Sequence, residues 1–220
     1  MDAFAKVLAA AGLDVSRRAL DHGYAASGVY LGRVWSEDRD VPVERHVATI
    51  LAAADPELPR RVTTPVMAEL VDAYTSPALL VPPAVDPMAR VALETLTAHG
   101  YSIVLVSNTM RTPGATLRKV LERYELLGFF KHTTFSDEVG IRKPAPEIFA
   151  LSLRAVGGDA ATAVHVGDDA RLDVAGARAA GMRVIQVRSA SLPPAGQTPD
   201  AVITSLRDLP RAIESLAHGR

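Results

Sequence analysis

The sequence predicts an α/β protein with a Rossmann-like parallel sheet core and an N-terminal helical domain. Residues 1–77 carry apolar side chains at helical spacing and no convincing strand, whereas helices alternate with short apolar strands from residue 86 onward. This alternation is typical of βαβ units and a parallel sheet. The proline-bearing residues 76–87 separate the two patterns. We therefore expect a helical domain over residues 1–78 and an α/β core over residues 79–220.

The N-terminal helices are predicted from periodicity and from helix-ending residues. Phe4, Val7 and Leu8 share one helical face before Gly12 ends the segment. Three further helices are expected over residues 24–35, 42–54 and 64–74. Asp38-Arg39-Asp40 does not follow an apolar strand, so we interpret it as a solvated loop.

The core is predicted to begin with a helix from Asp86-Pro87 to His99-Gly100, because Asp is a good N-cap and Pro suits the first helical position. Short apolar runs then indicate strands, and the segments between them have helical spacing. The expected strands are residues 103–106, 133–135, 164–166, 183–187 and 201–203, and the expected helices are 112–126, 146–155, 174–181 and a last one from about 208.

Composition excludes several classes of function. The chain has 220 residues, a net charge of −1, scattered basic residues and no cysteine, so nucleic-acid binding, disulfides and cysteine chemistry are not expected. No apolar run approaches the roughly 20 residues that cross a bilayer. We expect a cytoplasmic protein without a membrane partner. The histidines lack metal-ligand spacing: His165 is interpreted as a packed core residue and His46 as a surface residue.

An acidic turn is the clearest candidate site. Gly167-Asp168-Asp169 follows the apolar residues 163–166, and Asp173 comes five positions after Asp168. The carboxyl edge of an open parallel sheet is where ligands bind. Clustered carboxylates repel unless a cation lies among them, and oxygen ligands favour Mg²⁺. The alternative is that either acid of the turn only caps a helix. We favour the metal site because two further motifs accompany it.

The second and third motifs carry polar and basic groups. Ser107-Asn108-Thr109 ends a predicted strand, where hydroxyl and backbone N–H groups can hold phosphate oxygens, although an ordinary turn has the same composition. Lys143, held next to Pro144, could neutralise a phosphoryl group, although a surface lysine is the usual case. Their order along the chain, each at a strand–helix junction, favours the functional interpretation.

With these three motifs the chain resembles the haloacid dehalogenase-like hydrolase superfamily, whose members are mostly Mg²⁺-dependent phosphatases. Ser107-Asn108-Thr109 matches its second motif, Lys143-Pro144 its third, and Gly167-Asp168-Asp169 with Asp173 its fourth. The resemblance is close over residues 81–187, and it implies that the helical domain is a cap that determines the substrate.

The resemblance also implies roles for the site residues. Asp168 would hold Mg²⁺, with Asp169 or Asp173 completing or orienting its shell. Ser107 and Asn108 would bind phosphoryl oxygens, and Lys143 would offset their charge. The substrate implied is a small phosphomonoester, hydrolysed through an aspartyl-phosphate.

The chain departs from the family in one respect. The first motif, an apolar strand ending in Asp-x-Asp that carries the nucleophile, has no counterpart here, although in the family it is the central strand. Its removal would leave two strand edges unpaired and a slot in the core. We expect a start site placed too far downstream, omitting about 15 to 25 residues, and an inactive chain as given. The alternative is a non-catalytic family member that binds a ligand or partner through its helical domain.

Overall fold

The computed structural model describes residues 1–188 and 198–218, which form two compact units. The first, here called the helical unit, consists of residues 1–83, 109–120 and 135–140. The second, the α/β unit, consists of residues 84–108, 121–134 and the described residues from 141 onward. Two short segments of the C-terminal half therefore pack with the N-terminal helices.

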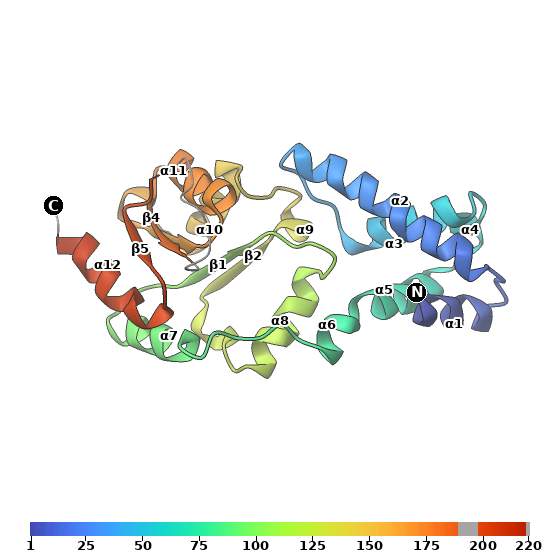
Figure 1. The fold of residues 1–220 in the computed structure, drawn as a ribbon, viewed down its shortest axis with the longest axis horizontal. Helices are drawn as coiled ribbons and strands as arrows, with labels where there is room; N and C mark the ends of the chain where they lie inside the picture. Colours follow the sequence, from blue (N-terminus) through green and yellow to red (C-terminus); the bar gives the residue numbers. More distant parts are fainter. Residues whose placement is uncertain (189–197, 219–220) are drawn as a thin grey trace. The chain divides into compact units, whose positions relative to one another are not determined.

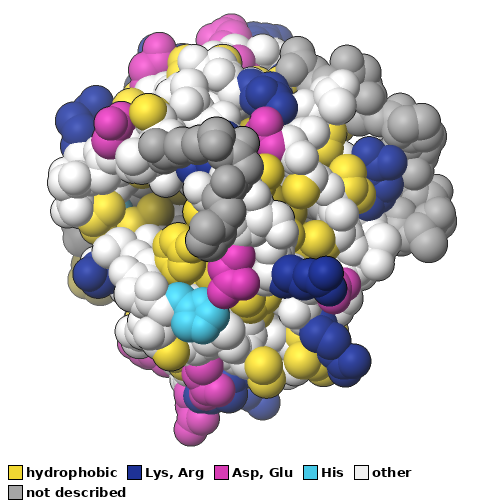
Figure 2. Space-filling model, turned by 90° about the vertical axis from the view of Figure 1, so that its left-hand side faces the viewer, with side chains coloured by type: hydrophobic (Ala, Val, Ile, Leu, Met, Phe, Trp, Pro, Cys, Tyr) yellow, Lys and Arg dark blue, Asp and Glu magenta, His cyan; other side chains and the backbone are white. Residues whose placement is uncertain are grey.

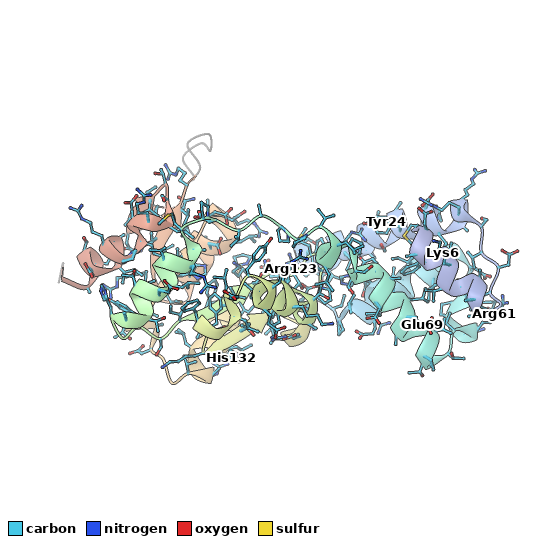
Figure 3. The ribbon with its side chains drawn as sticks, turned by 90° about the horizontal axis from the view of Figure 1, so that it is seen from below. Lys6, Tyr24, Arg61, Glu69, Arg123 and His132 are labelled. Carbon is cyan, nitrogen blue, oxygen red and sulfur yellow. The ribbon has the colours of Figure 1, made fainter. Side chains whose placement is uncertain are left out.

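The N-terminal helices of the helical unit are those that the periodicity predicts. They are α1 (Asp2–Ala10), α2 (Arg17–Ser36), α3 (Val43–Ala54) and α5 (Thr64–Thr75), joined by the short helices α4 (Leu58–Arg61) and α6 (Pro77–Leu80). Ser16 caps α2 by accepting from the backbone N–H of Ala19 at 3.2 Å. The apolar faces meet in one buried core of Phe4, Leu8, Leu13, Leu20, Val47, Ile50, Leu51, Leu58 and Leu70. The charged side chains of Lys6, Arg61 and Glu69 remain exposed (Figure 3).

Helices α2 and α3 cross where α2 carries a glycine. A Cβ atom on Gly23 would lie 2.3 Å from the carbonyl oxygen of Ile50, so only glycine allows this approach. None of the helices in the described residues is both long enough and apolar enough to span a membrane.

The interpretation of residues 38–40 as a solvated loop is wrong for Asp40. This residue is only 5% exposed, and its carboxylate accepts from Trp35 Nε1 at 3.0 Å and from Ser136 Oγ at 2.5 Å. Thr109 also donates its hydroxyl to the same carboxylate at 3.3 Å. Asp40 thus links the N-terminal helices to both later segments of the helical unit, the second of which forms the short helix α9 (Ser136–Val139).

His46 is also placed differently from the prediction, because it is 2% exposed and lies in the interior of the helical unit. Neither ring nitrogen has a hydrogen-bond partner among the described residues, and the ring forms a T-shaped pair with Tyr74 at 6.0 Å between centroids. Burial lowers the pKa of His46, since the charged imidazolium would lose its hydration. The sequence pattern missed this because His46 occupies an apolar position of α3.

We expect the stability of the protein to fall as the pH drops below the ordinary histidine pKa of 6.5. The unfolded chain then takes up a proton that folded His46 resists, so protonation favours unfolding. Urea denaturation between pH 7.5 and pH 5 measures this, and His46→Leu should flatten the dependence. His22→Leu, at an exposed position of α2, should leave it unchanged. Equal pH profiles for the wild type and His46→Leu would contradict the prediction.

The strands of the α/β unit form two separate sheets. Strands β1 (Val104–Ser107) and β2 (His132–Phe135) make one sheet, and β3 (Val164–Gly167), β4 (Arg183–Val187) and β5 (Ala201–Ile203) make the other in that order. The second sheet is parallel, with Val164 opposite Arg183 and Ile185 opposite Ala201. The parallel α/β core predicted from the alternating pattern is confirmed.

Helices cover both faces of the larger sheet (Figure 1). On one face, α7 (Ala89–Ala98) and α12 (Leu209–His218) bury Leu96, Leu209 and Ile213 against Ile185. On the other face, α10 (Pro146–Ala155) and α11 (Gly176–Ala179) bury apolar side chains that include Phe149. The face seen in Figure 2 mixes acidic and basic side chains with apolar ones, in keeping with the net charge of −1.

A cavity of about 550 Å³ lies between β1 and β3, and we call it the slot. Residues 102–106 line one side and residues 163–166 the other, with apolar side chains from α7, α10 and α12 completing the walls. Among the described strands, β1 pairs only with β2 and β3 only with β4, so each presents an unpaired edge. The slot therefore has the backbone chemistry to accept one more strand.

Candidate active site

Asp173 is the centre of a polar cluster at one end of the slot. Lys143 Nζ donates to its Oδ1 at 2.6 Å, and His165 Nε2 lies 2.8 Å from the same oxygen. The backbone N–H of Asp169 donates to Oδ2 at 3.0 Å. The Asp173 and Lys143 side chains are 4% and 13% exposed, so this ion pair is largely shielded from water.

The electrostatics of this cluster keep Asp173 ionised. Burial raises the pKa of its carboxyl group, but hydrogen bonds from His165 and Lys143 and the lysine charge outweigh burial and hold the pKa well below the ordinary value. Because an ionised carboxylate only accepts, His165 donates from Nε2. The Lys143 ammonium has two N–H donors beyond the one given to Asp173, and these can meet an oxyanion.

Asn108 fixes the loop that carries Lys143. Its Oδ1 accepts from the backbone N–H of Lys143 at 2.7 Å, and its Nδ2 donates to the Lys143 carbonyl oxygen at 2.9 Å. Asn108 directly follows β1, and Asp173 follows β3 by six residues. Since Lys143 contacts both, the carboxyl ends of β1 and β3 lie at the same end of the slot, where Ser107 ends β1.

The two acids of the turn after β3 have different surroundings. Asp169 Oδ1 accepts from the backbone N–H groups of Arg171 and Leu172, at 2.8 and 2.7 Å, so this residue caps the following helical segment. The carboxylate of Asp168 is exposed and has no partner among the described residues, while its carbonyl oxygen accepts from Gln186 at 3.0 Å. Asp168 is thus the acid available to an external ligand.

Gly167 is required for the approach of Asp173 to this turn. A Cβ atom at Gly167 would lie 2.2 Å from Asp173 Cγ. Gly167→Ala is expected to push the carboxylate away from Lys143 and lower the free energy of unfolding by about 2 kcal/mol. Urea denaturation tests this. Gly128→Ala is the matched control because no atom lies within 4 Å of its added Cβ. Equal effects of the two substitutions would contradict this role for Gly167.

The residues at this end of the slot fit a magnesium ion in part. No group of three or more His, Cys, Asp or Glu side chains is gathered for a metal within residues 1–188 and 198–218. Mg²⁺ needs fewer protein ligands than that, because it binds through one or two carboxylates together with substrate phosphate and water. Asp168 offers one such carboxylate, and both oxygens of Asp173 are occupied by Lys143, His165 and Asp169.

The structure brings the predicted residues Asn108, Lys143, Asp169 and Asp173 together through direct hydrogen bonds. Ser107 and Asp168 lie at the ends of β1 and β3 that flank them. The sequence interpretation missed the part played by His165, which bonds Asp173 and meets Phe149 edge-on at 5.0 Å between centroids. The position of His165 in a strand, two residues before Gly167, predicts which face of the strand it lies on. It does not predict the hydrogen bond to Asp173.

A sequence model of the haloacid dehalogenase-like hydrolases matches residues 2–181. The chain belongs to this family. Similar hydrolases include the ribulose-1,5-bisphosphate 5-phosphatase of Halopiger xanaduensis, 34% identical over 147 residues, which cover 67% of this chain and 59% of that protein. The glyceraldehyde 3-phosphate phosphatase of Pyrococcus abyssi is 36% identical over 99 residues, 45% of this chain and 40% of that protein. The chain thus matches about half the length of these curated relatives.

Solved structures of family members share the fold. The 2-haloacid dehalogenase of Pseudomonas syringae pv. Tomato aligns with a TM-score of 0.68 at 24% identity, covering 100% of this chain and 90% of that one. A phosphatase of the family from Thermococcus onnurineus aligns with a TM-score of 0.58 at 24% identity, covering 88% and 87%. At this identity the similarity establishes the architecture of a haloacid dehalogenase-like hydrolase.

Proposed function

We propose that this chain forms the phosphate-binding part of a Mg²⁺-dependent phosphatase acting on a small phosphomonoester. The observation that carries the proposal is the cluster around Lys143. Lys143 bonds both Asn108, which follows β1, and Asp173, which follows β3. A shielded ammonium with two spare donors beside a strand end suits a phosphoryl group. The names of the similar hydrolases, all phosphatases among those given above, support the same class of reaction.

Each residue then has a role set by its surroundings. The Ser107 hydroxyl donates to a phosphoryl oxygen, and Asn108 contributes its backbone, because its carboxamide is used to hold Lys143. Lys143 offsets the charge of the transferring group. Asp173 keeps Lys143 in place and charged, and His165 keeps Asp173 oriented. Asp168 is the metal ligand, with Asp169 shaping the turn. A bound Mg²⁺ supplies charge stabilisation for the phosphoryl oxygens.

The proposed reaction also requires a nucleophile, and a strand in the slot could carry it. A strand between β1 and β3 would end beside Ser107 and Asp168. An aspartate at that end would lie where a nucleophile could reach a phosphorus atom held by Ser107 and Lys143. In the family this strand ends in Asp-x-Asp, so we propose that such a strand completes the site, whether it is joined to this chain or added as a peptide. The second aspartate would act as the general acid.

The test is phosphomonoester hydrolysis by this chain completed with an apolar strand ending in Asp-x-Asp, fused ahead of Met1 or supplied as a peptide. We expect Mg²⁺-dependent hydrolysis with the Asp strand and at least about 100-fold less when its first aspartate is Asn. The chain alone should be inactive. Hydrolysis that is equal with the Asp and Asn strands would contradict the mechanism. A filled slot without hydrolysis would favour the non-catalytic binding protein.

A further inference from the structure

Arg111 is held against helix α2 in the helical unit through its Nη1 atom and one face of its guanidinium. Its Nη1 donates to Tyr74 Oη at 3.0 Å and to Ser27 Oγ at 3.3 Å. The guanidinium carbon lies 4.1 Å from the centroid of the Tyr24 ring, a cation–π contact. Tyr24, labelled on α2 in Figure 3, is 38% exposed, so this position opens to solvent.

Helix α2 carries a small residue, Gly28, beside the Arg111 side chain. A Cβ atom on Gly28 would lie 3.1 Å from Arg111 Nη2, so glycine leaves the room that the guanidinium fills. Glycine in a helix interior is less favourable than alanine. Ser27, the neighbouring residue, is fully buried and directs its hydroxyl to the carbonyl oxygen of Tyr24 at 2.7 Å, which leaves its lone pairs for Arg111.

The charge of Arg111 has no anionic partner in the described part of the chain. Its contacts there are two neutral hydroxyls and one aromatic ring, whereas Arg118 nearby in the sequence pairs with Glu138. A half-buried guanidinium loses hydration, and this cost is usually offset by a carboxylate or phosphate. An external anion that binds at this position would neutralise the charge of Arg111.

The donors that remain, on Nε and Nη2, have no hydrogen-bond partner among the described residues. Arginine has five N–H groups, and here the two on Nη1 face Tyr74 and Ser27. The N–H groups of Nε and Nη2 form the parallel pair that binds carboxylate or phosphate in bidentate fashion. Tyr74 adds a donor, because its hydroxyl oxygen accepts from Arg111 and its own proton is free of any partner within the described residues. Burial raises the pKa of Tyr74, so the phenol keeps that proton at neutral pH.

We propose that Arg111 and Tyr74 form an oxyanion-binding site in the helical unit, which takes the carboxylate or phosphate group of a small molecule. The anion can be a second charged group of the substrate, in which case the inference rests on the proposed function, or a free anion. The binding site itself requires neither hydrolysis nor a strand in the slot.

The direct test is NMR of the arginine Nε–H groups during titration with malonate, against sodium chloride at equal ionic strength. We expect the Arg111 signal, assigned by its loss in Arg111→Lys, to shift and saturate. Arg60, exposed and paired with Glu57, is the internal reference and should not saturate. Tyr74→Phe should weaken binding about 5- to 10-fold. An Arg111 signal that does not respond, or responds as Arg60 does, would overturn the proposal.

Kinetics of the strand-completed protein identify the source of the anion. Arg111→Lys keeps the positive charge but loses the two parallel N–H donors of the guanidinium. A rise in the KM of a phosphomonoester that also carries a carboxylate, with no change in the KM of an alkyl phosphate of the same length, would identify the anion as a group of the substrate. If both KM values are unchanged while malonate still binds at Arg111, the site takes a free anion. Failure of hydrolysis in all variants would refute the proposed function and leave the NMR result to decide on the site.

Discussion

Replacing Lys143 with methionine is expected to lower the free energy of unfolding by about 3 kcal/mol, because the substitution leaves the buried Asp173 carboxylate without its cation. Asp173 would keep only His165 and the Asp169 backbone as partners. Urea denaturation at pH 7 measures the loss. The exposed residue Lys131 provides the control, since Lys131→Met should change stability by less than about 0.5 kcal/mol.

The same substitution separates structural from chemical effects. In the strand-completed protein, Lys143→Met should reduce the hydrolysis rate by about 100-fold or more, since a positioned charge on the transferring group is lost. Asp173→Asn should also destabilise the protein, because Lys143 then loses its counterion. A Lys143→Met protein that is as stable and as active as the Lys131→Met control would contradict the role given to this ion pair.

Filling the slot with an apolar strand is expected to raise the free energy of unfolding by about 3 kcal/mol. Two unpaired strand edges gain hydrogen bonds, and each apolar side chain buried contributes about 1.5 to 3 kcal/mol before the cost of ordering the strand. The experiment compares the fused strand with a matched strand that carries a central proline. Proline lacks the N–H that the ladder requires, so this control should give little or no stabilisation.

Hydrogen exchange locates the effect of the strand. The amides of β1 and β3 should become protected on addition of the apolar strand, because their free edges line the slot. The amides of α1 in the helical unit should not change. Stabilisation without protection of β1 and β3 would show that the strand binds elsewhere. This result would contradict the proposal that the strand fills the slot.

Much of the fold could be predicted from the sequence, because apolar periodicity and helix-capping residues act locally. The strand runs at β1 and β4 and the proline-led helix α10 lie within a residue or two of the predicted ranges. Asp40 and His46 were misjudged, and the contact of His165 with Asp173 was missed, for a common reason. Their surroundings are set by residues distant in the sequence, such as Ser136 for Asp40, and by burial that no local pattern reveals.

The sequence predicts the motifs of the candidate site, but it does not predict which groups hydrogen-bond to one another. The order of Ser107, Lys143 and Asp168 along the chain indicated one edge of a sheet. The use of Asn108 to hold the Lys143 backbone and of Asp169 to cap a helical segment depends on which groups meet after folding. The three acids therefore differ: Asp168 has an exposed carboxylate without a partner among the described residues, Asp169 caps a helical segment, and Asp173 is held by Lys143.

The most direct test of the central claim is the intact mass of the strand-completed protein, quenched in acid during turnover of a phosphomonoester with Mg²⁺. We predict an increase equal to one phosphoryl group, mapped to the first aspartate of the added strand and absent from its Asn variant. Hydrolysis without this covalent species, or with a phosphoryl group on another residue, would contradict the proposed phosphatase mechanism.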